Sequence, residues 1–300
     1  MLSQIQKWSS FVRFSHTVFA LPFALAAMAV AARDNRGWPG WRICGLILAA
    51  MVCGRTCAMA FNRIVDRKFD ALNPRTARRH LPTGQIRLAS AVTLCVFAAA
   101  GLVAVSWFLN PLCFYLSPVA LVVICFYSLT KRFTDYTHVF LGISLALAPI
   151  GAWLAVKGAD ISPMEILQML TLAASVVLWL VGFDIIYALQ DYDFDRSHGL
   201  RSLVVAWGPK NALQAAFLAH MLMCGSLLVF GFLAFGPRPI PYTVGWLLIV
   251  GCLVLEHWIA RRRSLNWINV AFFRLNAVVS AVFFVVTLAE VVFQGGFAMR

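Results

Sequence analysis

Long apolar stretches are the feature of this sequence that most limits its fold. Nine stretches are about 18 or more residues long, which is enough for a helix to cross the ~30 Å hydrocarbon core of a bilayer. Within lipid, backbone polar groups must pair inside a helix or a closed barrel, and the sequence lacks the period-2 alternation of barrel strands. The sequence therefore predicts an all-α, polytopic membrane protein with about nine transmembrane helices in one bundle.

The composition supports these spans. Hydrophobic residues make up 61% of the chain and charged residues 12%, whereas soluble domains average about 25% charged residues. We expect a single transmembrane domain over residues 1–300. The predicted spans are about 15–32, 42–61, 88–109, 111–130, 137–156, 163–183, 211–235, 242–260 and 268–293.

The distribution of basic residues indicates an orientation. Of the 25 Lys and Arg residues, seventeen fall on the side of the N-terminus, six fall on the opposite side, and Arg55 and Arg274 fall inside spans. Because cytoplasmic loops are enriched in Lys and Arg, we expect a cytoplasmic N-terminus and an external C-terminus. These loops account for the net charge of +13, so we expect a lipid bilayer as the surroundings and no nucleic-acid partner.

A first polar stretch, residues 62–70, follows the second predicted span. It places Asn62, Asp66 and Asp70 four residues apart, so the three side chains share one face if the helix continues beyond the membrane. The alternative without a functional role is that these carboxylates are solvated and only balance the positive charge of an Arg-rich loop.

A second polar stretch, residues 184–195, follows the sixth predicted span, and the two stretches together hold six of the twelve acidic residues. On a continuous helix Asp184, Asp191 and Asp195 would lie within about 40° of one another, whereas Asp193 would point away. Both stretches fall on the predicted cytoplasmic side. We therefore expect the mouth of an active site there.

Two opposed groups of carboxylates repel each other unless a cation lies between them. Oxygen ligands without His or Cys at ligand spacing favour Mg²⁺, which usually completes its shell with water and phosphate oxygens. The predicted ligand is therefore a diphosphate. Basic residues that could contact its oxygens are Arg67, Lys68, Arg75, Arg78, Arg79, Lys131, Arg132, Arg196 and Arg201.

Arg55 is a charged residue inside a predicted span, where such residues normally face the bundle interior. It precedes Asn62 by seven residues and so lies on the same helical face, which predicts a contact with substrate, with structural pairing as the alternative. For Arg274, Glu256 and Glu290 we expect snorkelling or pairing between helices rather than chemistry. No role is assigned to His16, Asp184 or Asp193. Aromatic residues such as Phe14, Trp179 and Tyr187 are expected mainly to face lipid or to pack, with some lining the cavity.

The two stretches resemble the motifs of the UbiA superfamily of intramembrane aromatic prenyltransferases, and the likeness covers essentially the whole chain. The first reads Asn62-x3-Asp66-x3-Asp70, then Arg75-Thr76 and Leu81-Pro82-Thr83-Gly84. The second reads Tyr187-Ala188-x2-Asp191-x3-Asp195-x3-Gly199-x2-Ser202.

The resemblance implies a role for each matching residue. It implies Mg²⁺ ligands at Asn62, Asp66, Asp70, Asp191 and Asp195. It implies catalytic residues at Asp66, Asp70, Asp191 and Asp195, and substrate-binding residues at Arg55, Asn62, Lys131, Arg132 and Tyr187.

By this resemblance, the expected activity is Mg²⁺-dependent transfer of a polyprenyl group from polyprenyl diphosphate to a hydroxylated aromatic acid of the 4-hydroxybenzoate type. The expected setting is quinone biosynthesis in a bacterial inner membrane, with no obligatory protein partner. Arg63 stands where the family commonly has Asp, Arg79-His80 stands for the usual Arg-Pro, and residues 14–22 look more like a subgroup linked to menaquinone made by the futalosine route. A naphthoate or haem-type acceptor therefore stays open, as do a transporter and a non-catalytic assembly factor.

Overall fold

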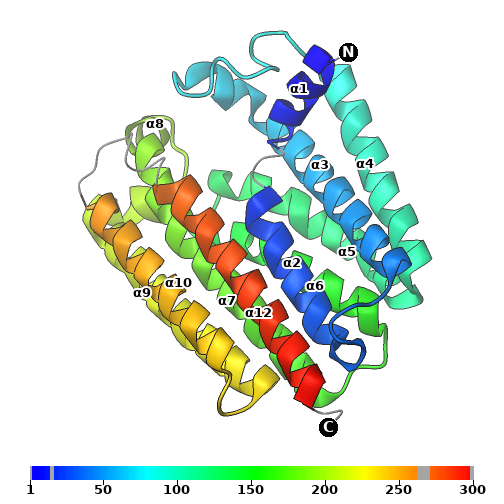
Figure 1. Ribbon diagram of the computed structural model, residues 1–300. Helices are drawn as coiled ribbons and strands as arrows, with labels where there is room; N and C mark the ends of the chain where they lie inside the picture. Colours follow the sequence, from blue (N-terminus) through cyan, green and yellow to red (C-terminus); the bar gives the residue numbers. More distant parts are fainter. Residues whose placement is uncertain (1, 14–16, 262–270, 298–300) are drawn as a thin grey trace.

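The computed structural model describes residues 2–13, 17–261 and 271–297, and within these ranges the chain is helical with no strand. Figure 1 shows a bundle of roughly aligned helices, with α1 and the end of α12 at opposite ends. The helices are α1 (Leu2–Phe11), α2 (Thr17–Ala31), α3 (Trp41–Leu72), α4 (Leu88–Leu109), α5 (Pro111–Phe126), α6 (Thr137–Lys157), α7 (Pro163–Ala188), α8 (Tyr192–Ser197), α9 (Leu203–Phe235), α10 (Ile240–Ala260) and α12 (Asn276–Phe297).

The predicted membrane fold is confirmed. Among the described residues, eight helical segments are long and apolar enough to cross a bilayer, and they match the second to the ninth predicted span. The first predicted span corresponds to α2, an apolar helix of 15 residues. His16 and Phe14 lie outside the described residues.

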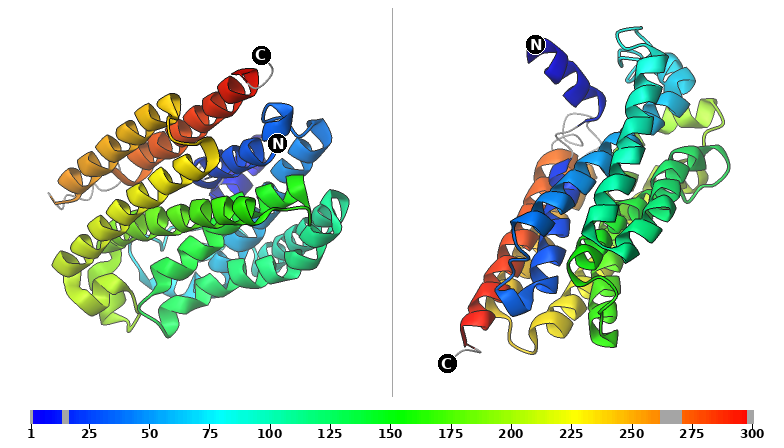
Figure 2. Two further views of the ribbon diagram at one scale, coloured as in Figure 1. Left: turned by 90° about the horizontal axis from the view of Figure 1, so that it is seen from below. Right: turned by 90° about the vertical axis from the view of Figure 1, so that its right-hand side faces the viewer.

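Helix α7 lies at the centre of the bundle. In the segment that contains it, 67% of the most apolar window is buried, against 11% for α4. It packs between α6 and α9, while α2 packs between α6 and α12. The left-hand view of Figure 2 shows the resulting arrangement, with α4 and α5 on one side and α9, α10 and α12 on the other.

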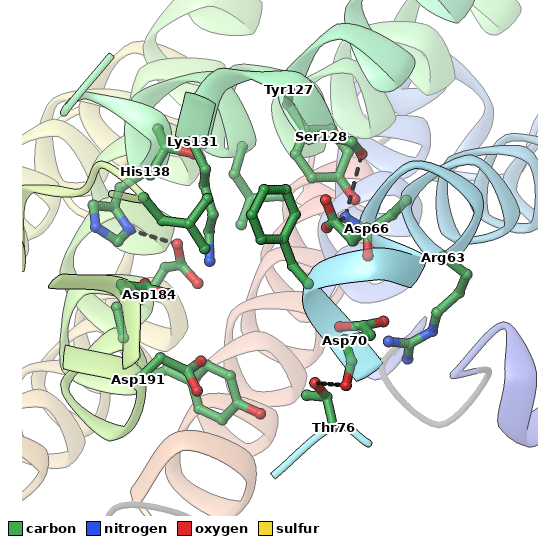
Figure 3. A pocket seen from close by; sticks show the side chains of 18 of the residues that line it. Arg63, Asp66, Asp70, Thr76, Tyr127, Ser128, Lys131, His138, Asp184 and Asp191 are labelled. Carbon is green, nitrogen blue, oxygen red and sulfur yellow. Dashed lines mark hydrogen bonds and ion pairs between the residues drawn. The ribbon is translucent and has the colours of Figure 1, made fainter. Parts of the chain in front are cut away.

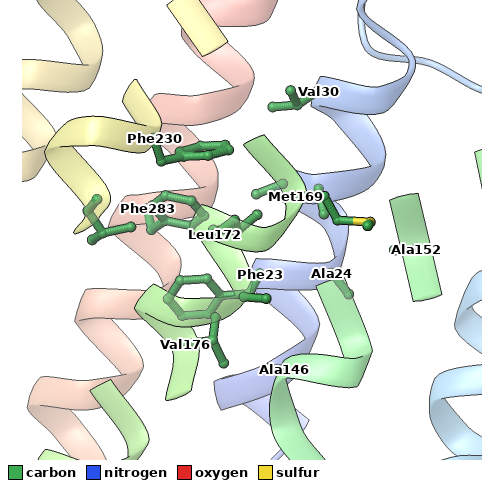
Figure 4. Close-up of a cluster of buried hydrophobic side chains, with 14 of the residues drawn as sticks. Phe23, Ala24, Val30, Ala146, Ala152, Met169, Leu172, Val176, Phe230 and Phe283 are labelled. Atoms are coloured by element: carbon green, nitrogen blue, oxygen red, sulfur yellow. The ribbon is translucent and has the colours of Figure 1, made fainter. Parts of the chain in front are cut away.

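The main core joins α2, α7, α9 and α12 through aromatic side chains (Figure 4). Phe23 stacks on Phe283 with ring centroids 4.7 Å apart, and Trp179 packs edge-on against Phe183 at 4.9 Å. The packing role predicted for Trp179 is confirmed. Truncating a buried aromatic residue to alanine typically costs about 3–5 kcal/mol, so this cluster holds the central helices together.

A buried chain of polar side chains joins α7, α9, α10 and α12. His220 Nδ1 lies 2.9 Å from His257 Nε2, and His220 Nε2 lies 3.2 Å from the carbonyl oxygen of Trp179. The Trp179 indole donates to Asn276 Oδ1 at 2.6 Å, and Asn276 donates to Glu256 Oε1 at 2.8 Å. Such bonds join helices in an apolar environment, so the pairing predicted for Glu256 is confirmed.

Glu290 also joins two helices. Its carboxylate accepts from the backbone N–H of Tyr242 at 3.2 Å, near the start of α10, and from Gln294 at 2.9 Å. The pairing predicted for this residue is likewise confirmed. Arg274 is exposed.

The ends of α3 and α7 and the start of α9 differ from the predicted spans in ways that shape the polar end of the bundle. Helix α3 continues to Leu72, well past residue 61, whereas α7 ends at Ala188 in a 3₁₀ turn over Leu189–Asp191. Helix α9 starts at Leu203 rather than 211, with a kink at Gly208. The continuous helix assumed for residues 184–195 is therefore wrong.

The crossing of α7 and α9 depends on Gly182, because a Cβ there would lie 2.2 Å from ring atoms of His220. We expect Gly182→Ala to displace His220 and to lower the free energy of unfolding by about 1–3 kcal/mol, the usual cost of overpacking. Thermal unfolding in detergent measures this. The matched control is Gly225→Ala in α9, where a Cβ meets nothing within 4 Å. Equal stability of the two variants would contradict the role of Gly182.

Candidate functional site

A cavity of about 270 Å³ opens among α3, α6, α7 and α8 at one end of the bundle. Figure 3 shows polar side chains from both polar stretches pointing into it. All the residues predicted as metal ligands, catalytic residues or substrate-binding residues from the two motifs and their neighbours line this cavity: Arg55, Asn62, Asp66, Asp70, Lys131, Arg132, Tyr187, Asp191 and Asp195. Asp184 lines it as well, whereas Asp193 is exposed and points away as predicted.

The first polar stretch is presented by α3, whose α-helical geometry is kept to Leu72. Asn62 Nδ2 donates to Asp66 Oδ2 at 2.9 Å and to Ser128 Oγ at 3.4 Å. Arg132 donates to the carbonyl oxygen of Val65 at 2.9 Å and lies 3.5 Å from Asp66 Oδ1. The shared face predicted for Asn62 and Asp66 is thus confirmed.

Asp70 lies one turn further along α3 and is only 6% exposed. Arg79 donates to its Oδ1 at 2.6 Å, whereas its Oδ2 is buried without a hydrogen-bond partner. The hydroxyl of Thr76 donates to the backbone carbonyl of Asp70 at 3.1 Å. A buried carboxylate oxygen without a partner is costly, so this atom is available to a ligand.

The second polar stretch is held by the loop that follows α3. Arg75 Nε donates to Asp191 Oδ1 at 2.8 Å, and a second guanidinium nitrogen donates to Oδ2. Asn73 donates to the same carboxylate at 3.1 Å, and Arg75 also donates to the hydroxyl of Tyr187 at 2.8 Å. Burial of Arg75 opposes its charged form, but the bonds to Asp191 and Tyr187 outweigh it and raise the pKa of Arg75.

Lys131 lies between the two groups of acids. Its charge interacts with Asp195, Asp184, Asp191 and Asp66, and Figure 3 shows its side chain directed into the cavity. The backbone N–H of Arg201 donates to the carbonyl oxygen of Lys131 at 2.8 Å, which fixes the turn after α5. Such a central ammonium can interact with carboxylates or with an anionic ligand.

Asp184 has a partner that the sequence did not indicate. Its Oδ2 lies 2.6 Å from Nδ1 of His138, which is buried on α6 and lines the same cavity. The two residues are 46 positions apart and belong to different spans, so no local pattern links them.

Other lining residues were also missed: Arg13, Asn73, Thr76, Tyr127, Ser128 and His138. Asn73 and Thr76 carried a usable signal, since Asn-Pro-Arg-Thr directly after a helix is typical of a turn. Several predicted phosphate contacts lie elsewhere, because the cavity lining does not include Arg67, Lys68, Arg78, Arg196 or Arg201.

The oxygen atoms that line the cavity could supply only part of the coordination shell of Mg²⁺. The described residues contain no group of three or more His, Cys, Asp or Glu side chains arranged to hold a metal ion. The carboxylates of Asp66, Asp70, Asp191 and Asp195 nevertheless line one cavity, and Asp70 Oδ2 lacks a partner. Hard oxygen donors of this kind suit Mg²⁺ when water and phosphate oxygens complete the coordination.

A second cavity, of about 300 Å³, lies between α3, α4, α5 and α6 and is lined mainly by apolar side chains. The two cavities adjoin, since Arg55, Tyr127, Leu141 and Leu145 line both. A ligand with a charged head and an apolar tail matches this pair of cavities. Fold and site together define an integral membrane protein with a polar cavity for such an amphiphile.

The chain matches the sequence profile of the UbiA prenyltransferase family over residues 20–278. A 4-hydroxybenzoate octaprenyltransferase of Burkholderia mallei (strain NCTC 10247) is 33% identical over 219 residues, which cover 70% of this chain and 70% of the relative. One from Tolumonas auensis is 27% identical, covering 85% and 86% respectively. The chain therefore belongs to the UbiA prenyltransferase family and is a polyprenyltransferase.

Solved structures agree with this assignment. The apo structure of a UbiA homologue from Aeropyrum pernix K1 has a TM-score of 0.80 at 33% identity, covering 93% of this chain and 98% of that chain. A UbiA homologue from Archaeoglobus fulgidus bound to GPP and Mg²⁺ has a TM-score of 0.69 at 22% identity, covering 94% and 99%. The second likeness concerns the fold alone. Membership of an enzyme family overturns the transporter and assembly-factor alternatives.

Arg75 connects the loop after α3 with Asp191, so we expect Arg75→Gln to loosen residues 73–79. Hydrogen bonds to charged groups contribute about 1.5–3 kcal/mol, so amide exchange in this segment should accelerate about tenfold or more in hydrogen-exchange mass spectrometry. Arg78→Gln is the matched control, because Arg78 is exposed in the same loop and lies outside the cavity lining. Unchanged exchange in Arg75→Gln would show that the loop is held by other contacts.

Proposed function

We propose that this protein transfers a polyprenyl group from polyprenyl diphosphate to the ring of a hydroxylated aromatic acid of the 4-hydroxybenzoate type, in quinone biosynthesis. The observation that carries the proposal is the pair of adjoining cavities, one lined by carboxylates and basic side chains and the other mainly apolar. The names of the bacterial relatives support the acceptor class, and the A. fulgidus homologue bound to GPP and Mg²⁺ supports the donor class.

The donor binds with its diphosphate in the polar cavity and its prenyl chain in the apolar one. Lys131 and Arg132 contact diphosphate oxygens from the turn after α5, and Arg75 and Arg79 do so from the loop after α3. Guanidinium groups match phosphate oxygens in geometry, and an ammonium acts as a point charge. These side chains orient the diphosphate and stabilise the charge that develops on it.

The residues that would hold Mg²⁺ are Asn62, Asp66, Asp70, Asp191 and Asp195. Bound there, Mg²⁺ supplies Lewis-acid neutralisation of the diphosphate leaving group. With the diphosphate among these side chains, the prenyl chain enters the apolar cavity past Arg55, Tyr127, Leu141 and Leu145, which line both cavities.

In the reaction, the bond between the allylic carbon and the diphosphate oxygen breaks, and its electron pair leaves with the diphosphate. A carbon–carbon bond then forms between the allylic carbon and the acceptor ring, which loses a proton. Apolar walls exclude water from the cationic carbon. Aromatic faces stabilise a nearby cation, and the polar cavity provides Phe19, Phe69, Tyr127, Phe183, Tyr187 and Phe194.

Arg55 binds the carboxylate of the acceptor. Its Nε is buried without a partner, and one of its terminal nitrogens lies 3.4 Å from the carbonyl oxygen of Arg13. Arg55 lines both cavities, so an acid bound there has its ring beside the allylic carbon. Charge pairing with a buried guanidinium then selects acids over neutral phenols.

The protein acts as a single transmembrane domain over residues 1–300, in the inner membrane of a bacterium and without an obligatory protein partner. We place its polar cavity and N-terminus on the cytoplasmic side and its C-terminus on the external side. The excess of Lys and Arg at that end supports this orientation through the positive-inside rule.

The decisive assay incubates purified protein with Mg²⁺, a polyprenyl diphosphate and candidate acids, namely 4-hydroxybenzoate and hydroxylated naphthoates, and follows the prenylated product. We expect Asp66→Asn and Asp191→Asn to lower product formation by about a hundredfold or more, since each removes a charge that the diphosphate site requires. Asp193→Asn, at an exposed position outside the cavity, should retain full activity. Native rates in both cavity variants would refute the site.

Removal of divalent metal should weaken the binding of inorganic pyrophosphate, because the carboxylates that line the cavity repel a polyanion when no metal ion lies between them. Isothermal titration of the protein with pyrophosphate, in EDTA and then in excess Mg²⁺, measures this without turnover. We expect about tenfold or greater tightening with Mg²⁺. Equal affinity under both conditions would remove the metal from the proposal.

A further inference from the structure

Arg63 is a buried arginine with no partner in the described part of the chain. Its residue is 6% exposed and lines the polar cavity. No hydrogen bond or ion pair joins its guanidinium to a described residue, although its charge interacts with that of Asp70. In Figure 3 the guanidinium points toward Asp70, on the wall opposite Lys131.

Other arginines of the cavity differ from it. Arg75 is bound to Asp191, Arg79 to Asp70, and Arg132 lies 3.5 Å from Asp66. A guanidinium carries five N–H donors, and burying a charge without a partner is costly. None of the guanidinium nitrogens of Arg63 is among the fully buried atoms without a partner, so they face the cavity, where the oxygens of a ligand can supply the acceptors that this part of the chain does not.

The overall charge of the cavity points the same way. Seven cationic side chains and five carboxylates line it, which leaves two positive charges in excess among the described residues. Arg63 is surrounded by part of this excess, since the charges of Arg79 and Arg13 act on it. An anion would neutralise this region, whereas a second metal ion would add to the repulsion.

We propose that Arg63 is a substrate-binding residue whose guanidinium contacts an oxyanion of a bound substrate. This inference rests on the proposed prenyl transfer, which brings two oxyanions into the cavity: the diphosphate of the donor and the carboxylate of the acceptor. Both present paired oxygens that suit a guanidinium. Because Arg63 stands two helical turns beyond Arg55 on α3, it binds its oxyanion closer to Asp70, toward the end of the helix.

The test measures binding without turnover. Native protein, Arg63→Gln and Arg63→Lys are titrated separately with Mg²⁺-pyrophosphate and with 4-hydroxybenzoate by isothermal calorimetry in detergent. Arg67→Gln is the matched control, because Arg67 lies four residues further along α3, outside the cavity lining, with its guanidinium bound to the carbonyl oxygen of Ile64 at 2.9 Å.

We expect Arg63→Gln to weaken one of the two ligands about tenfold or more, as the loss of a charged hydrogen bond does, and Arg63→Lys to weaken it less. Weaker pyrophosphate binding assigns Arg63 to the donor, and weaker 4-hydroxybenzoate binding assigns it to the acceptor. Arg67→Gln should bind both as native protein does. Unchanged affinity for both ligands in a folded Arg63→Gln variant overturns the inference.

The measurements distinguish a failure of the proposed activity from a failure of the inference on Arg63. If native protein binds pyrophosphate and Arg63→Gln does not, but no acid is prenylated, the role of Arg63 stands and the acceptor class is wrong. If thermal unfolding shows that Arg63→Gln is destabilised while ligand affinities per folded molecule are native, Arg63 is structural and the inference is overturned.

Discussion

The ion pair between Arg75 and Asp191 is the contact on which the site depends. Asp191 follows α7, whereas Arg75 follows α3, and these helices pack mainly against different neighbours. Asn73 and the hydroxyl of Tyr187 add to the same link. Asp191 is buried whereas the side chain of Arg75 is 30% exposed, so the attraction is only partly screened by water and is stronger than that of a fully exposed pair. The short loop after α3 therefore sets the distance between the two acidic groups.

Much of the fold could be predicted from the lengths of the apolar stretches alone. Apart from a closed β-barrel, a helix is the only structure that satisfies the backbone hydrogen bonds of a segment crossing lipid. The first acidic group was also predictable, because α3 keeps a 3.6-residue period through Asn62, Asp66 and Asp70 as far as Leu72. The relative positions of these three side chains could be predicted without knowledge of any tertiary contact. Positions in one uninterrupted helix are fixed relative to each other by the backbone.

The second acidic group was predicted with the right residues and the wrong geometry. The helix stops at Ala188, and tertiary contacts rather than helical periodicity bring Asp191 and Asp195 to the cavity. Likewise, nothing local joins His138 to Asp184 across 46 residues. The sequence marked Arg63 as unusual within its motif, but its burial and lack of a described partner depend on packing between distant segments. Pairings between helices are therefore the part of the site that periodicity cannot supply.

The unequal burial of the helices has a consequence for how this sequence can change over time. Helix α4, with Val96 61% and Phe97 73% exposed, presents a wide apolar surface to lipid, which is fluid and adapts to any apolar shape. Helix α7 meets fixed neighbours instead, such as His220 against Gly182. Substitutions among apolar residues should thus accumulate along α4 with little effect, whereas α7 can change only together with its partners. The number of substitutions that each helix can accept therefore depends on whether it faces lipid or protein.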